Sequence, residues 1–61
     1  MNTRYIMTTA YSDFSSKTEH SDDLMALLRA AGIYWEDPSC EYIHVWDTVA
    51  HMDVMCFSRP S

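Results

Sequence analysis

Hydrophobic positions recur with helical spacing in one part of the chain. The apolar side chains there follow the i, i+3, i+4, i+7 pattern of an amphipathic helix: Leu24, Leu27, Leu28 and Ala31. Ser21 is a suitable N-cap, and Asp22 and Asp23 follow it in the first turn, where the helix dipole favours anions. Gly32, the only glycine, stands where a helix often ends on a residue of positive φ. The pattern predicts a helix at about residues 21–31.

The other apolar segments are typical of strands, because aromatic and β-branched side chains suit a pleated surface. Residues 4–11 mix such side chains with Thr and alanine, whereas residues 12–18 have the composition of a loop. Residues 33–36 and 41–46 flank the turn signal Asp37-Pro38-Ser39 and are predicted to form a hairpin.

The end of the chain allows two interpretations. We prefer a last strand at 52–58 after a connection at 47–51, and the alternative is a short helix capped at Asp47 or Thr48 and running through Met52. The predicted fold is a single α+β domain over residues 1–61. It contains a small antiparallel β-sheet of three or four strands in the order β-α-β-β-β, with one amphipathic helix on one face.

Alternation along the strands gives the sheet two apolar faces. Ile43 and Val45 point to one face, and an aromatic row points to the other: Tyr42, His44 and Trp46. A single short helix covers one face. The other must be closed by the N-terminal segment, by a second copy or by a partner, unless the sheet twists and the termini fold over it. Exposed aromatic patches often mark interaction sites.

Composition restricts the classes of function. A domain of 61 residues buries only about 60% of the surface of its unfolded chain, so we expect no deep substrate cleft and no enzyme. The net charge of −5 argues against direct nucleic-acid binding, which depends on phosphate neutralisation by Lys and Arg. Met, Tyr and Trp replace many branched aliphatic residues, so the core is expected to be loosely packed.

Targeting signals are not evident. The segment MNTRYIMTTAY lacks the apolar run of about 7–15 residues that a signal peptide contains. No stretch approaches the roughly 18–20 apolar residues of a membrane helix, so we expect a cytoplasmic protein with no membrane partner. Cys40 and Cys56 are then expected as free or buried thiols rather than as a disulfide.

Cysteine and histidine residues have the composition of a zinc site but not its spacing. On one strand, Cys40 and His44 would lie about 13 Å apart on the same face, whereas zinc ligands reach to within about 2.0–2.3 Å of the metal. The addition of His51 and Cys56 supplies no close Cys pair. Phosphate loops and nucleophile motifs are also missing, so we expect no metal, no cofactor and no catalytic residue.

The acidic residues are the candidates for partner binding. They lie at the helix start, around the turn and near the last hairpin: Asp22 and Asp23; Glu36, Asp37 and Glu41; and Asp47 and Asp53. Stabilisation of the helix end explains the first group equally well. The turn group could enter a basic groove on another protein, with Trp35 or Trp46 as a buried anchor, since Arg pairs with carboxylates and stacks on Trp.

By its size, its acidity and the groups Asp22-Asp23, Glu36-Asp37 and Asp47, the chain resembles the small acidic anti-CRISPR proteins, in particular inhibitors of type I effectors such as type I-C. The resemblance implies a non-enzymatic inhibitor that binds a Cas subunit in the host cytoplasm and blocks DNA recognition. Anti-CRISPR proteins share no common fold, so the resemblance assigns no residue by position.

Two other functions stay open from the sequence. One is a small self-associating structural or adaptor subunit, and the other is an acidic antitoxin-like neutraliser of a basic toxin. For the inhibitor we expect a monomer or weak homodimer whose partner is a protein with a basic, nucleic-acid-binding surface. The self-associating subunit would instead form a dimer through its uncovered sheet face.

Overall fold

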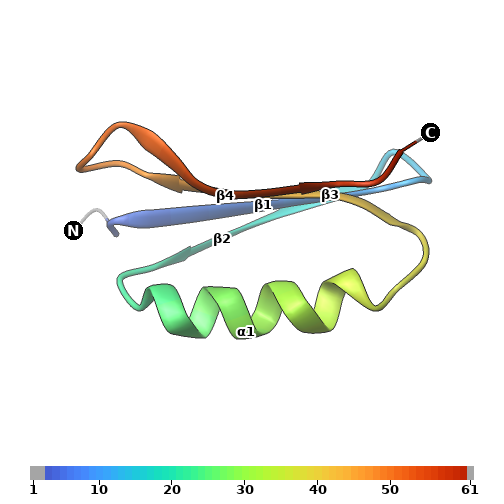
Figure 1. Cartoon of the computed structure of the whole chain (residues 1–61), viewed down its shortest axis with the longest axis horizontal. Helices are drawn as coiled ribbons and strands as arrows, with labels where there is room; N and C mark the ends of the chain where they lie inside the picture. Colours follow the sequence, from blue (N-terminus) through green and yellow to red (C-terminus); the bar gives the residue numbers. More distant parts are fainter. Residues whose placement is uncertain (1–2, 61) are drawn as a thin grey trace.

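The sheet and the helix form two layers in a computed structural model, which describes residues 3–60. The elements are β1 (Tyr5–Tyr11), β2 (Ser16–Ser21), α1 (Leu24–Trp35), β3 (Cys40–Asp47) and β4 (Met52–Ser58). The strands form one 4-stranded antiparallel sheet in the order β2-β1-β3-β4. The helix α1 lies along one side of this sheet (Figure 1). The α+β class, with an antiparallel sheet and one helix within the described residues, is confirmed.

The strand β2 lies partly in a segment that we expected to be a loop. It pairs with β1 from Tyr5 opposite Ser21 to Ala10 opposite Ser16. Its sequence, SKTEHS, is polar throughout because β2 is an edge strand with most of its side chains exposed. An edge strand of this kind lacks the apolar alternation that reveals a strand in a sequence. The chain order is therefore ββαββ: two strands precede the helix where the sequence predicts one, and two follow it where the sequence predicts three.

The start of α1 is set by Asp23 rather than by Ser21. The Asp23 carboxylate accepts a hydrogen bond from the Ala26 amide at 3.2 Å, as an N-cap does. Ser21 has a different part in the same turn, since its hydroxyl accepts a hydrogen bond from the Asp23 amide at 2.9 Å. The cap therefore lies two residues later than the predicted one.

The end of α1 lies beyond the predicted end, at Trp35. Gly32 does not terminate the helix, and its φ is not positive. Tyr34, which we had placed in a strand, is held on the helix by two residues of β2: its hydroxyl donates to Glu19 at 2.8 Å, and the Lys17 Nζ lies 3.5 Å from its ring centroid. The predicted hairpin between 33–36 and 41–46 is therefore wrong, and β3 pairs with β1 and β4 instead.

The connection between β3 and β4 is a turn, so the alternative short helix is wrong. The Asp47 carboxylate accepts from the amides of Val49 and Ala50 at 2.9 and 3.1 Å, which is the capping geometry that the sequence suggested. A helix does not follow, because His51 adopts a left-handed conformation with φ of 56° and the chain turns back into β4.

The hydrophobic core lies between α1 and the sheet. Its buried apolar members come from both layers: Met7, Leu27, Ala31, Cys40, Ile43 and Val45. The predicted orientation of Ile43 and Val45 towards one face is confirmed, and the register places them beside Thr9 and Met7 of β1. This face is the one that the helix covers.

Candidate functional site

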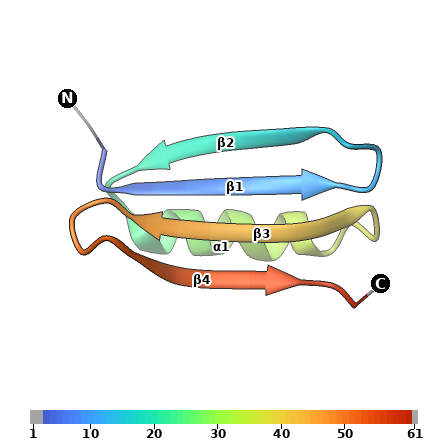
Figure 2. The same ribbon diagram turned by 90° about the horizontal axis from the view of Figure 1, so that it is seen from above.

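The side of the sheet away from α1 has no element of residues 3–60 packed over it (Figure 1), and Figure 2 looks onto this side. The strand β3 contributes the aromatic row Tyr42, His44 and Trp46. In the register of the sheet their neighbours on β1 are Ala10, Thr8 and Ile6, and β4 adds Cys56 and Asp53. We call these residues the open face. The six on β1 and β3 are half-buried by one another, and Cys56 and Asp53 are exposed.

The aromatic row is ordered by contacts along β3. The Tyr42 and His44 rings stack with centroids 5.9 Å apart, and the His44 and Trp46 centroids are 6.3 Å apart. The His44 Nε2 lies in hydrogen-bond contact with the Asp53 carboxylate across the strands. Burial raises the pKa of Tyr42, and the nearby Cys56 and Asp53 add to this effect, so its hydroxyl remains protonated and able to donate.

The N-terminal segment does not close this face, because β1 is part of the sheet between β2 and β3. Residues 1 and 2 lie outside the described residues. Of the closures expected from the sequence, a second copy and a partner therefore remain.

The two tryptophans have different surroundings. Trp35, at the end of α1, packs against Phe57 with centroids 5.3 Å apart, and the Arg59 guanidinium lies 4.1 Å from its ring centroid. Arg59 also donates from Nε to the Cys40 carbonyl at 2.6 Å and from Nη2 to the Trp35 carbonyl. Trp35 is therefore engaged within the chain, and Trp46 is the tryptophan on the open face.

The acidic turn between α1 and β3 lies at the end of the sheet where Tyr42 stands. Glu36 and Glu41 are exposed. Asp37 accepts hydrogen bonds from the amide and hydroxyl of Ser39 at 2.9 and 2.8 Å, which lower its pKa. The hydrogen bonds of Asp37 order the turn, and its acidic residues adjoin the Tyr42 end of β3.

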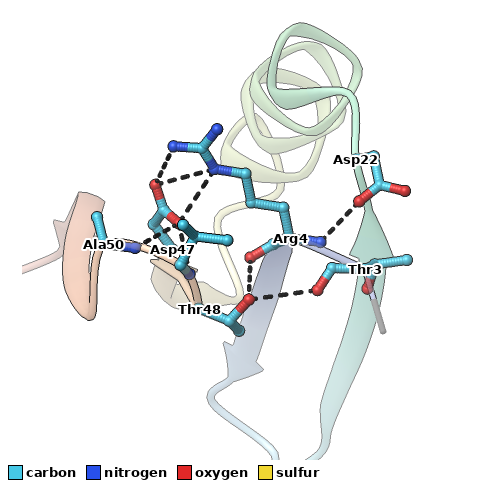
Figure 3. Close-up of polar contacts among 7 residues, drawn as sticks. Thr3, Arg4, Asp22, Asp47, Thr48 and Ala50 are labelled. Carbon is cyan, nitrogen blue, oxygen red and sulfur yellow. Dashed lines mark hydrogen bonds and ion pairs between the residues drawn. The ribbon is translucent and has the colours of Figure 1, made fainter. Parts of the chain in front are cut away.

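The predicted acidic residues Asp22, Asp23 and Asp47 also have contacts within the chain, and Figure 3 shows those of Asp22 and Asp47. Asp47 is 5% exposed and pairs with Arg4, whose Nη2 lies 3.0 Å from its Oδ2. The hydrogen bond from Arg4 is the largest cause that lowers the pKa of Asp47 to about 2. Asp22 accepts from the Arg4 amide at 2.7 Å, and Asp23 caps α1. The Asp47 carboxylate is therefore occupied within the chain. Helix-end stabilisation holds for Asp23, which caps α1, but not for Asp22, which binds the Arg4 amide, and neither residue lies in the first turn as predicted.

The sequence missed the contribution of β1 to the open face. Ile6, Thr8 and Ala10 lie opposite Trp46, His44 and Tyr42 only because β1 pairs with β3, far away in the chain. A local pattern cannot reveal that pairing, although the i, i+2 spacing placed the three residues on one face.

The described residues were also searched for metal-ligating clusters, reactive thiols and membrane-spanning helices. Within residues 3–60, no group of His, Cys, Asp and Glu residues could hold a metal ion. Cys40 is buried and Cys56 exposed, and both are free thiols, as expected. In the same part of the chain, none of the helical structure has the length and apolar character needed to cross a membrane.

No protein-family model matches the chain, and neither a curated protein nor a solved structure does.

Proposed function

We propose that this protein is a non-enzymatic binding protein that docks its open face on a basic surface of another protein. The carrying observation is the aromatic row on the open face, which has no cover among residues 3–60. A few hot-spot residues supply most of the binding energy at protein interfaces, and Trp and Tyr are enriched among them. Trp46 is the proposed anchor.

The negative charge of the chain favours a partner with a basic surface. The chain carries a net charge of −5, and the exposed carboxylates of Glu36 and Glu41 stand at the Tyr42 end of the open face. A field of this sign speeds association with a basic surface and opposes association with nucleic acid itself. A protein surface that normally holds nucleic acid is therefore the proposed target, and its occlusion is the proposed mode of action.

The resemblance to small acidic anti-CRISPR proteins gives this target a concrete form. We propose a DNA-binding subunit of a type I CRISPR–Cas surveillance complex in the host cytoplasm, with type I-C as the first system to examine. Bound there, the protein would compete with target DNA.

The test is binding to a purified type I surveillance complex, measured with and without target DNA. The native protein should bind and displace DNA. Trp46→Ala should weaken binding about 30-fold, as loss of a hot-spot residue of about 2 kcal/mol does. Charge reversal at Glu36, Asp37 and Glu41 should slow association, most strongly at low salt.

Ile33→Ala is the matched control, because Ile33 is an apolar side chain that is 67% exposed on α1, in the other layer. It should leave affinity unchanged, and circular dichroism should show that every variant is folded. Unchanged affinity for Trp46→Ala would refute the open face as the docking site. Unchanged association after charge reversal would refute the acidic contribution.

A further inference from the structure

The two edges of the sheet differ in chemistry. β2, at one edge, carries the charged residues Lys17 and Glu19. β4, at the other edge, has the sequence MDVMCFS, in which the only charged residue, Asp53, is paired with His44. Natural proteins protect sheet edges with Lys, Pro, charges or bulges, because an exposed edge presents unpaired backbone groups. β2 has this protection, and most of β4 does not.

A bulge limits the exposed edge to the second part of β4. The register shifts between Val45 and Trp46, so that Met55 faces Val45 but Asp53 faces Trp46, and Val54 is the extra residue. The beginning of β4 bends away from the helix side (Figure 1). From Met55 to Ser58 the pairing with β3 is regular, so residues 55–58 form the regular edge and the bulge residue Val54 stands at its limit.

The segment 54–58 is apolar and poorly covered. Val54 and Phe57 are 38% and 39% exposed, and the Cys56 residue is exposed as well. α1 runs beneath β1, β2 and β3 and reaches β4 through the contact of Trp35 with Phe57. No residue from 54 to 58 is charged, so two copies of this acidic chain can meet there without like charges in the paired segment.

We propose that β4 pairs with β4 of a second copy of this chain, antiparallel, with Cys56 opposite its counterpart. Val54 then faces Ser58 on the open side, and Met55 faces Phe57 on the helix side. Each pair joins side chains that already share a face. A shift by one residue would set Met55 against Cys56, from opposite faces. A shift by two, centred on Met55, would set the bulge residue Val54 opposite Cys56 and bring Asp53 into the pairing opposite Phe57, so that the bulge would lie within the paired segment.

The two-fold axis of this dimer is perpendicular to the sheet. The two sheets become continuous, both copies of α1 lie on one side, and both open faces lie side by side on the other. The dimer leaves the aromatic row of each copy accessible, so it is compatible with a partner on the open face and does not depend on one.

Mass measurement by light scattering over a concentration series tests the pairing. The mass of the native protein should rise from the 7.1 kDa of one chain towards twice that value. Val54→Lys should raise the dissociation constant at least about tenfold, because Lys on an edge opposes strand pairing. The matched control is Thr18→Lys on the β2 edge, which should leave the dimer intact. Circular dichroism should show both variants folded.

Oxidation with diamide tests the register. Two Cys56 thiols that face each other lose their hydrogens to diamide and form one disulfide, since paired strand positions lie within disulfide reach. The native protein should give a cross-linked dimer, and Cys56→Ser should not. In a Val54→Cys, Cys56→Ser variant the new thiol faces Ser58 instead of its own counterpart, so cross-linking should be slower by about tenfold or more.

Addition of Ser58→Cys to that variant should restore fast cross-linking, because positions 54 and 58 face each other in the proposed register. A constant monomer mass, or equal cross-linking rates for single thiols at 54 and 56, would overturn the proposal. These measurements need no partner protein, so their failure leaves the proposed function to its own test.

Discussion

Asp47 shows how much one side chain determines in a protein of this size. Its carboxylate accepts hydrogen bonds from the guanidinium of Arg4, which immediately precedes β1, and from the amides of Val49 and Ala50 in the β3–β4 turn. The hydroxyl of Thr48, next in the chain, donates to the Arg4 carbonyl at 2.8 Å. One carboxylate thereby joins the first strand to the last hairpin (Figure 3).

The ion pair predicts acid sensitivity. The pKa of Asp47 is lowered to about 2 in the folded protein, against about 3.9 for an unperturbed Asp. A lowered pKa adds stability that is complete above the unfolded value and is lost as the pH falls through the folded value. The melting temperature should therefore fall between about pH 5 and pH 2, and Asp47→Asn should flatten that fall while lowering the melting temperature at pH 7.

Thermal unfolding followed by circular dichroism across this pH range is the measurement. Glu36→Gln serves as a control, because it removes an exposed carboxylate of the same charge. If Asp47→Asn and the native protein lose stability in parallel below pH 5, the ion pair does not contribute as described.

Thr9 offers a second prediction at the residue scale. It is fully buried opposite Ile43, and its hydroxyl has no hydrogen-bond partner among the described residues. A buried polar group without a partner costs about 1–3 kcal/mol. Thr9→Val keeps the shape and removes the hydroxyl, so the free energy of unfolding should rise by about 1 kcal/mol.

Urea unfolding with an unchanged m-value would measure this gain. Thr8→Val, on the half-buried open face, is the matched control and should change stability by less than about 0.5 kcal/mol. A loss of stability in Thr9→Val would mean that the hydroxyl is satisfied.

At the scale of elements, α1 contains a glycine, Gly32, which lowers the stability of the helix. Gly32 is exposed in the helix, has no positive φ, and a Cβ at this position would meet no atom within 4 Å. Glycine in a helix interior costs about 0.5–1 kcal/mol relative to alanine. Gly32→Ala should therefore stabilise the protein by about that amount, which corresponds to roughly 2–8 °C in melting temperature.

Ala26→Gly, at an exposed position of the same helix, should have the opposite effect and calibrates the comparison. If Gly32→Ala lowered the melting temperature, the helix would need glycine at this position for a reason other than its backbone conformation.

Elements with a strong local pattern could be predicted, and elements set by distant contacts could not. The spacing of Leu24, Leu27 and Ala31 defined α1, and alternation around Ile43 and Val45 defined β3 and its faces. β2 could not be predicted, because a polar edge strand has no alternation of apolar and polar residues. The end of α1 could not be predicted, because the helix continues beyond Gly32 to Tyr34, which contacts Lys17 and Glu19 on β2.

The candidate site was predictable to a similar extent. The aromatic row followed from the period of a strand, and Asp53 lies beside it. The sequence could not decide whether Trp35 or Trp46 is the anchor, because Trp35 is engaged by Arg59, which lies near the end of the chain. The loss of Asp47 from the site depended equally on Arg4.

At the scale of the whole molecule, order should decrease from the centre of the sheet to one edge. The buried sheet residues belong to β1 and β3, whereas in β4 only Met55 is half-buried. Backbone amides of β1 and β3 should therefore exchange slowest with solvent, and those of β4 faster, at low protein concentration. Hydrogen exchange followed by mass spectrometry measures this order, and equal protection of all strands would contradict it.

Within residues 3–60 only one side of the sheet is covered, and we expect this to affect how long the protein persists in a cell. The apolar core lies in a single contact between layers, so we expect the unbound chain to be of low stability and to open often enough for proteases to reach it. A partner seated on the bare side would add the free energy of binding to that of folding. Copies without a partner would then be degraded first, and the amount of this protein would follow the amount of its target.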